Sequence, residues 1–378
     1  SGSYYCKCNT YNQTEKGEKN KMKKILPIAL SALLLMTGCS GGGKTATEDP
    51  IEKYGSDKLK LFTWGEYLGE NVISNFEKEY GVDVIVEYFD SNEMMYTKLQ
   101  AGDAYDVIVP SDYMIQRLIS EGSLQELDKS LIPNMDNLTD GVKNLAFDPD
   151  NTYSVPYFWG SVGIVYNKNN VPKDLIEEKG FEILRDTDYA GDIYMYDSER
   201  DSFMVALKAL GYSMNTTDDA EIEEAYQWLL DLNSTMNPAY VTDEVIDNMM
   251  NGTKDIAVVY SGDATVILDE NEDMDFFMPS EGTNIWCDSM CIPTNAENPL
   301  LAHEFINYIL TYDASYDNSI TVGYASTNDE VLNEIAENEY AENAAYLPRD
   351  GYDKDEVFED NETMRQKLSQ LWLKVKAQ

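Results

Sequence analysis

Apolar and polar residues follow two different periods along residues 58–121, and the switch between these periods predicts strands separated by helices. Short apolar runs predict strands over 58–64, 82–89 and 105–110. Apolar residues at helical spacing predict helices over 69–80, 92–101 and 113–121, the second of them behind Ser91 as its N-cap. Strands that alternate with helices of about ten residues are typical of a parallel α/β sheet.

Two further series of elements follow along the chain. The second series covers 153–168, 191–212, a helix over 220–232, 255–268 and 276–293. The third runs from a helix over 300–310 through 320–328 to an amphipathic helix over 362–376. The first two series are joined by a strand, without a long Pro- or Ser-rich linker or an internal repeat. We therefore expect two α/β lobes that are hinged by short crossovers.

Residues 22–39 have the parts of an export signal. Met22 and two lysines form a charged start, and the apolar run over 25–36 is too short to span a bilayer. The ending Met-Thr-Gly-Cys resembles a lipobox, which predicts lipidation at Cys39; the alternative is a buried segment that ends in an ordinary cysteine. We expect residues 1–38 to be an upstream segment with a lipoprotein signal peptide, and 39–56 to be a flexible tether.

The acidic net charge of the chain limits the classes of partner that it can bind. The chain has 28 Lys and Arg against 69 Asp and Glu, a formal net charge of -41, and 43% of its residues are hydrophobic, which is ample for a globular fold. Binding to phosphates needs clustered basic residues, so this charge argues against nucleic acid and against anionic membrane surfaces. It favours cationic ligands, although a surplus of acids also serves simply to keep a surface soluble.

Cysteine and histidine argue against a metal centre. Cys287 and Cys291 are four residues apart in a predicted strand, about 13 Å at about 3.3 Å per residue, which is too far for a disulfide. The single histidine, His303, lies on a predicted helix, and we expect it to be structural or exposed. Without a Cys/His cluster, the sequence predicts no zinc site, no haem and no cofactor.

Seven segments in order resemble the spermidine/putrescine-binding family of ABC-transporter extracellular solute-binding proteins. They are LFTWGEY, SNEMMYTKLQAGDAYDVIVPSDYMIQRL, YSVPYFWGSVGIVYN, YDSERDSFMVALKALGYSMNTTD, VVYSGDA, EGTNIWCDSMCIP and VGYASTN. The resemblance implies a two-lobed, periplasmic-binding-protein-like (type II) fold that crosses between lobes near Trp159, Asp288 and Tyr324. Lobe 1 would hold 57–158 with 289–323, and lobe 2 would hold 159–288 with 324–378.

The resemblance also implies a set of ligand contacts. Carried over residue by residue, they are Trp64, Glu66, Tyr67, Ser111, Tyr113, Asp201, Tyr260, Asp263, Trp286, Asp288 and Tyr324. This chain departs from the family at Gly65, where Thr or Ser is usual, at Tyr260, where Trp is common, and at Ser198, which is acidic in some spermidine binders. Asp197 is a candidate to replace the acid missing at Ser198.

The chemistry of a polyamine explains these residue types. Its ammonium groups need carboxylates, because a charge buried without a partner costs several kcal/mol. Its methylenes and its charges both favour aromatic faces, at roughly 0.5 to 2 kcal/mol per cation–π contact. Taken singly, each Trp at a strand end is more often half-buried core and each acid is more often surface. Trp64–Tyr67 and Ser111–Tyr113 nevertheless follow predicted strands at the edge where ligands bind in α/β sheets.

We therefore expect a monomeric, lipid-anchored, extracellular polyamine receptor, not an enzyme, that delivers its ligand to ABC permease subunits. Preference between putrescine and spermidine stays open, as does the identity of the permease. The alternatives are a receptor for another amine or a sugar, an extracellular hydrolase with two carboxylates, or a surface antigen without a ligand.

Overall fold

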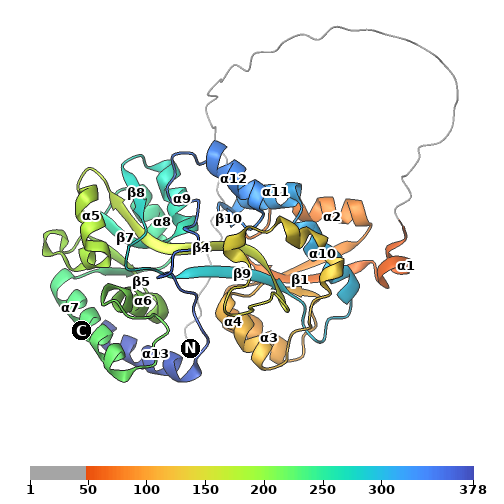
Figure 1. The fold of residues 1–378 in the computed structure, drawn as a ribbon, viewed down its shortest axis with the longest axis horizontal. Coiled ribbons are helices and arrows are strands. Elements are labelled where there is room, and N and C mark those ends of the chain that lie inside the picture. Colours follow the sequence, from red (N-terminus) through yellow and green to blue (C-terminus); the bar gives the residue numbers. More distant parts are fainter. Residues whose placement is uncertain (1–47) are drawn as a thin grey trace, which may run out of the picture. The chain divides into compact units, whose positions relative to one another are not determined.

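Two hydrophobic cores organise residues 48–378, the part of the chain that this computed structural model describes (Figure 1). The strands are β1 (Lys58–Trp64), β2 (Asp83–Phe89), β3 (Val107–Ile108), β4 (Ser154–Asn167), β5 (Ile193–Tyr196), β6 (Ala239–Val241), β7 (Ile256–Tyr260), β8 (Met274–Phe277), β9 (Ile285–Cys291) and β10 (Ala325–Ser326). They follow the order β2-β1-β3-β9-β4-β7-β5-β6, with β8 and β10 also paired to β4.

Helices cover the strands of both cores. The α-helices are α1 (Pro50–Tyr54), α2 (Val72–Tyr80), α3 (Asn92–Gln100), α4 (Asp112–Ser120), α5 (Lys173–Lys179), α6 (Glu199–Ala209), α7 (Asp219–Met236), α8 (Glu244–Met250), α9 (Ser261–Glu270), α10 (Pro299–Ile309), α11 (Tyr312–Val322), α12 (Asp329–Asn338) and α13 (Glu362–Lys376). Short 3-10 helices are η1 (Lys129–Leu131), η2 (Pro133–Asn137), η3 (Asp140–Val142), η4 (Gly180–Arg185) and η5 (Thr187–Tyr189).

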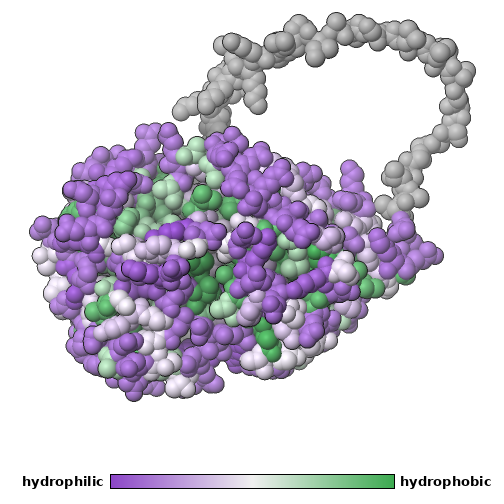
Figure 2. Space-filling model, in the orientation of Figure 1, coloured by the Kyte–Doolittle hydropathy of each residue, from purple (hydrophilic) through white to green (hydrophobic). Residues whose placement is uncertain are grey.

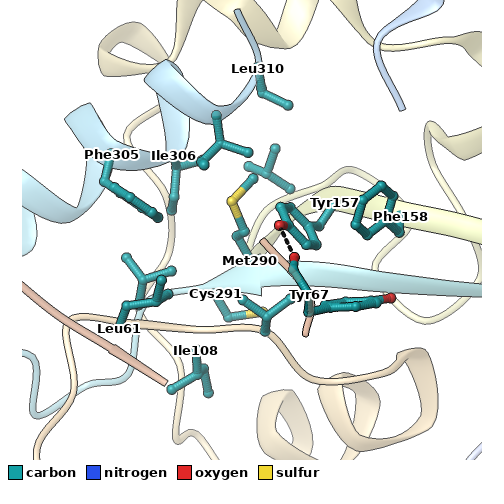
Figure 3. Close-up of a cluster of buried hydrophobic side chains, with 14 of the residues drawn as sticks. Leu61, Tyr67, Ile108, Tyr157, Phe158, Met290, Cys291, Phe305, Ile306 and Leu310 are labelled. Atoms are coloured by element: carbon teal, nitrogen blue, oxygen red, sulfur yellow. Dashed lines mark hydrogen bonds between the residues drawn. The ribbon is translucent and has the colours of Figure 1, made fainter. Parts of the chain in front are cut away.

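The first core forms around β1, which pairs in parallel with β2 and with β3. This confirms the alternation of strands and helices predicted for residues 58–121. Leu61 of β1 and Ile108 of β3 lie in this core with Phe305 and Ile306 of α10 (Figure 3). The core also contains Val331, Leu332 and Ile335 of α12, so the chain packs here well beyond residue 324.

The second core forms around β5, which pairs in parallel with β6 and with β7. Trp228 of α7 and Trp372 of α13 are both buried in this core. Helix α13 spans the residues that the sequence predicted for the C-terminal amphipathic helix. How residues 57–378 divide between two moving lobes stays a prediction.

Strand β4 belongs to both cores. Residues 154–161 pair antiparallel with β9, and residues 162–166 pair antiparallel with β7. Every residue of β4 before Asn167 is buried, which is why its sequence is apolar almost throughout. Figure 1 shows β4 and β9 side by side across the middle of the fold.

Most predicted helix boundaries agree with the structure to within one residue. The exceptions are α2, which begins later, and α7, which continues to Met236, while α1 lies in the segment 39–56 that was expected to be a flexible tether. Ser91 caps α3 as predicted, since its Oγ accepts a hydrogen bond from the backbone N–H of Met94. Helix α2 begins at Val72, not at residue 69, because Gly69 packs against α11. The N–H of Gly69 donates to Asn318 Oδ1 over 2.7 Å, and a Cβ on Gly69 would lie 2.7 Å from Asp317.

Both predictions for cysteine and histidine are confirmed. Cys287 and Cys291 are buried and unpaired in β9. His303 is buried on α10, where its Nε2 accepts a hydrogen bond from the backbone N–H of Asp128. The histidine therefore has a structural role.

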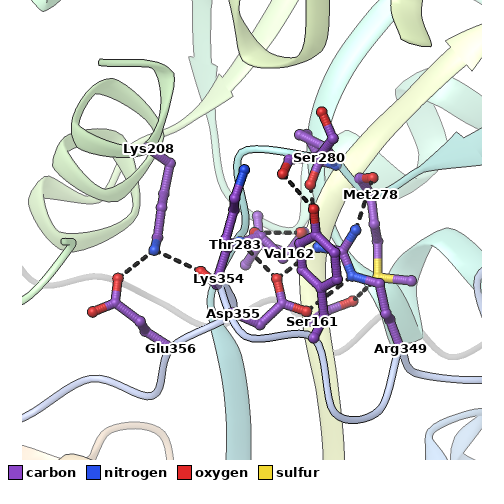
Figure 4. A network of polar contacts seen from close by, with 12 residues as sticks. Ser161, Val162, Lys208, Met278, Ser280, Thr283, Arg349, Lys354, Asp355 and Glu356 are labelled. Carbon is purple, nitrogen blue, oxygen red and sulfur yellow. Dashed lines mark hydrogen bonds and ion pairs between the residues drawn. The ribbon is translucent and has the colours of Figure 1, made fainter. Parts of the chain in front are cut away.

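The segment 349–361 connects the two cores. Lys208 of α6 donates to the carbonyl of Lys354 over 2.7 Å and pairs with Glu356, while Arg349 pairs with Asp355 (Figure 4). Further along, the N–H of Asp360 donates over 2.6 Å to the side chain of Gln116 on α4. Phe358 packs against both cores from this segment.

Polar side chains dominate the face drawn in Figure 2, with apolar residues showing in the middle of the view. Among residues 48–378, no helix is both long enough and apolar enough to cross a bilayer.

Candidate functional site

A cleft of about 520 Å³ lies where residues of the two cores meet. Nine of the eleven residues predicted as ligand contacts line it. They are Trp64, Tyr67, Ser111, Tyr113, Asp201, Tyr260, Trp286, Asp288 and Tyr324.

Asp288 lies on β9 among first-core residues. It is 8% exposed, and its Oδ2 accepts a hydrogen bond of 2.5 Å from the hydroxyl of Tyr67. Burial raises the pKa of Asp288 to about 6, while the hydroxyls of Tyr67 and Ser111 oppose this shift. None of the ion pairs within residues 48–378 includes this carboxyl.

Asp201 provides the matching carboxyl among second-core residues. It lies in the first turn of α6 and accepts a hydrogen bond of 2.6 Å from the hydroxyl of Tyr260. Burial raises the pKa of Asp201 above its ordinary value. Ser198 caps α6, with its Oγ accepting from the N–H of Asp201, and it does not line the cleft.

Aromatic rings line the same cleft as these two carboxyls. The rings of Trp286 and Tyr324 are 5.4 Å apart, edge to face, and the ring of Tyr67 is 5.9 Å from that of Tyr324. Trp64 is held at the end of β1 by a hydrogen bond of 2.9 Å from its indole N–H to the carbonyl of Val109. Tyr260 stacks on Tyr196 at 4.5 Å. The cleft therefore combines carboxyl groups with aromatic faces.

Two glycines allow these rings to lie so close together. Gly262 is at the start of α9, and a Cβ there would overlap the ring of Tyr324. A Cβ on Gly160 of β4 would lie 2.5 Å from the ring of Trp286. Both positions exclude any larger residue unless an aromatic ring of the cleft moves.

Two predicted contacts do not line the cleft. Glu66 is exposed and has a positive φ of 53°, a conformation that is uncommon for residues other than glycine, and its neighbour Gly65 lines the cleft instead. Asp263 is on α9 and accepts hydrogen bonds from the hydroxyls of Tyr196 and Tyr324. Burial raises the pKa of Asp263 to about 6. Asp263 therefore contacts Tyr324, which lines the cleft, but does not line the cleft itself.

Asp197 does not take the place of the acid missing at Ser198. It is absent from the cleft lining, and its carboxylate forms an ion pair of 2.8 Å with Lys376 of α13.

Sequence reasoning missed several lining residues. The most notable are Asp112, Arg200, Asn284 and Phe358. The guanidinium of Arg200 lies 3.8 Å from the centre of the Tyr113 ring, so this cation stacks on a wall of the cleft. Asn284 directly precedes β9 and lies two residues before Trp286, so the alternation of Trp286 and Asp288, continued one step back, was a signal in the sequence that could have identified it.

The buried carboxyls predict how stability depends on pH. Asp201, Asp263 and Asp288 all have pKa values raised by burial, so between about pH 4 and pH 6 the folded chain binds more protons than the unfolded chain. Stability then falls as pH rises, by about 1.4 kcal/mol per pH unit for each extra proton bound. We expect the melting temperature of the empty protein to be higher at pH 5 than at pH 8. A melting temperature that rises steadily over this range would contradict the burial of these groups.

The sequence of this chain is similar to those of known proteins. Residues 71–348 match the family of bacterial extracellular solute-binding proteins. The spermidine/putrescine-binding periplasmic protein of Salmonella typhimurium is 36% identical over 275 residues, which make up 72% of this chain and 78% of that relative.

Solved structures share the fold. The spermidine/putrescine ABC transporter substrate-binding protein PotD from Streptococcus pneumoniae, in complex with calcium and HEPES, is 35% identical with a TM-score of 0.77, over 85% of this chain and 99% of that chain. The TpPotD lipoprotein of Treponema pallidum is 29% identical with a TM-score of 0.73, over 84% of this chain and 99% of that chain. These similarities confirm the predicted α/β fold of the two-lobed type.

Proposed function

The chain belongs to the family of bacterial extracellular solute-binding proteins, and we propose that it is a polyamine receptor that delivers its ligand to an ABC importer. One observation carries the proposal: buried carboxyls from both cores, Asp288 and Asp201, face one aromatic cleft without a lysine or arginine paired to either of them in the ion pairs of residues 48–378. The names of its relatives, which include spermidine/putrescine-binding proteins, support the same ligand class.

A ligand with two or more ammonium groups joined by methylenes fits both the carboxyl groups and the aromatic rings of this cleft. Each ammonium group offsets the desolvation of one carboxylate, since a hydrogen-bonded ion pair replaces the water that both groups lose. The methylenes between the charges pack on the rings of Trp286 and Tyr324, where cation–π attraction adds to the apolar contact. The hydroxyls of Tyr67 and Tyr260 already donate to Asp288 and Asp201, which orients the two carboxyls toward such a ligand.

Titration with a panel of ligands tests this function. We expect putrescine or spermidine to raise the melting temperature of the purified protein, with a stabilisation of about 2.7 kcal/mol at a concentration of 100 times Kd. Agmatine tests the breadth of amine recognition, and calorimetry gives each affinity directly. Maltose serves as the control, because a neutral sugar offers no cation to the carboxyls. Stabilisation by maltose without any effect of the polyamines would refute the proposal.

The receptor is proposed to act as a monomer, tethered to the outer face of the cell membrane through a lipid on Cys39. This cysteine lies outside the described residues, so the support is its sequence context together with the lipoprotein relative in Treponema pallidum. A tether keeps a binding protein close to the permease subunits to which it delivers its ligand.

Replacement of Cys39 tests the tether. In native cells, Cys39→Ala is expected to move the protein out of the membrane fraction, because no diacylglycerol can be attached without the thiol. Its affinity for polyamines is expected to match that of the wild type, since the cleft is formed by residues far along the chain. Retention of the variant in the membrane fraction would count against lipidation.

A further inference from the structure

Besides Asp288 and Asp201, the cleft has a further buried carboxyl, which lies close to Asp288. Asp112 is 2% exposed and begins helix α4. Its Oδ2 accepts a hydrogen bond of 3.1 Å from the N–H of Cys287 on β9, and its Oδ1 accepts one of 2.7 Å from the N–H of Tyr113. The preceding residue, Ser111, forms a β-bridge with Asp288. These contacts place the carboxyl of Asp112 against the part of β9 that carries Asp288.

No lysine or arginine of the described residues forms an ion pair with either of these acids. Neither Asp112 nor Asp288 takes part in an ion pair of residues 48–378. Arg200 of α6 attracts Asp112 at longer range, but its guanidinium stacks on the ring of Tyr113. A pair of buried carboxylates that share no counter-ion is costly while both are ionised.

The other titratable groups that face the pair cannot supply a positive charge. Asp112 faces the thiol of Cys287 as well as Asp288 itself. Asp288 faces the hydroxyls of Tyr67 and Tyr324. Burial raises the pKa of all of these groups, so the phenols and the thiol remain neutral near pH 7. Because Arg200 stacks on Tyr113 and forms an ion pair with neither acid, full neutralisation of the pair needs a proton or a ligand.

We propose that Asp112 is a second carboxylate for the ammonium group that Asp288 binds, and that the pair gives up a proton when this ammonium group enters the cleft. The inference rests on the proposed function. In the empty cleft, one carboxyl of the pair carries the proton as an acid O–H. On binding, that proton passes to solvent and both carboxylates accept hydrogen bonds from the ammonium group. The ligand keeps all of its protons.

The pKa values of the two carboxyls are suited to this exchange. Burial raises the pKa of Asp112 to about 7, and the charge of Asp288 adds to the shift, while the N–H of Cys287 opposes it. An ammonium group favours the ionised form of each carboxyl and so lowers both pKa values in the complex. Protons and ligand therefore compete. Below about pH 7, affinity is expected to fall by up to tenfold per pH unit for each proton released.

Calorimetry in different buffers measures the exchange. The titrations use putrescine and spermidine at pH 6.5 in two buffers with different enthalpies of protonation, so that the difference in heat gives the number of protons released. We expect the wild type to release about half a proton or more per ligand bound. In Asp112→Asn, we expect about half of this release or less, and affinity about tenfold weaker. Asp269→Asn, at an exposed acid outside the cleft, is the control and should match the wild type.

The outcomes separate the inference from the function on which it rests. If Asp112 only holds β9 in place, Asp112→Asn will lower the melting temperature while proton release and affinity stay at wild-type values, which would overturn the inference. Asp112→Ser, which keeps an acceptor for a backbone N–H without a charge, replaces Asp112→Asn if the latter fails to fold. Tight binding to the wild type without proton release also overturns the inference but leaves the function standing. Absence of polyamine binding at every pH overturns the proposed function itself.

Discussion

Asp288→Asn is expected to weaken polyamine binding by about 30-fold or more, a loss of about 2 to 5 kcal/mol. The substitution keeps the shape of the side chain but removes its charge, so the ammonium group of the ligand is desolvated against a neutral amide. The stability of the empty protein should hold or improve, because Asp288 is a buried carboxyl with a raised pKa and without a paired cation. Calorimetric titration and a melting curve of the same sample measure both effects.

A matched substitution tests whether the effect belongs to the site. Asp269→Asn removes one acid from an exposed position on α9 and should bind polyamine like the wild type. A purely structural role of Asp288 would give the opposite result, with a destabilised empty protein and intact affinity. If the two variants bind polyamine equally well, the site proposed here is wrong.

Gly262→Ala is expected to weaken ligand binding at least tenfold, which is about 1.4 kcal/mol, and to destabilise the fold by about 1 to 3 kcal/mol. The added methyl group overlaps the ring of Tyr324, so the ring has to leave its position against Trp286 and Tyr67. A displaced Tyr324 also loses its hydrogen bond to Asp263, which is then left buried with one donor fewer. Affinity and melting temperature are the measurements.

Val266→Ala is the control for Gly262→Ala. Val266 lies on the same helix, α9, and is 38% exposed, so its truncation removes little packing. We expect its affinity to stay close to that of the wild type. Wild-type affinity in Gly262→Ala would mean that Tyr324 does not form a wall of the ligand site.

The order of strands and helices could be predicted from the sequence because burial follows the backbone period. In β9, Trp286 and Asp288 are two residues apart and line the cleft together, as alternation along a strand requires. The start of α2 was not predictable in the same way. It depends on the contact between Gly69 and α11, which lies nearly 250 residues further along the chain.

The candidate site was predictable only where a residue type matched a known pattern. Asp112 lies between two expected contacts, Ser111 and Tyr113, yet its importance comes from the N–H of Cys287, a partner that appears only after folding. Arg200 was missed because a basic residue in a site for cations has no obvious purpose; its stacking on Tyr113 is a tertiary contact. Glu66 was expected from the resemblance and from its place after a predicted strand, but it is exposed and has a positive φ.

The pairing of strand β4 affects how the molecule unfolds. Because its first half pairs with β9 and its second half with β7, loss of either core removes a neighbour from the same continuous strand. A core that melted alone would therefore leave half of one continuous strand without its partner, which couples the unfolding of the two cores. Heating should give a single calorimetric transition, and the amide protons of β4 should be among the slowest to exchange with deuterium. A protease that cuts one core open should lead to degradation of both.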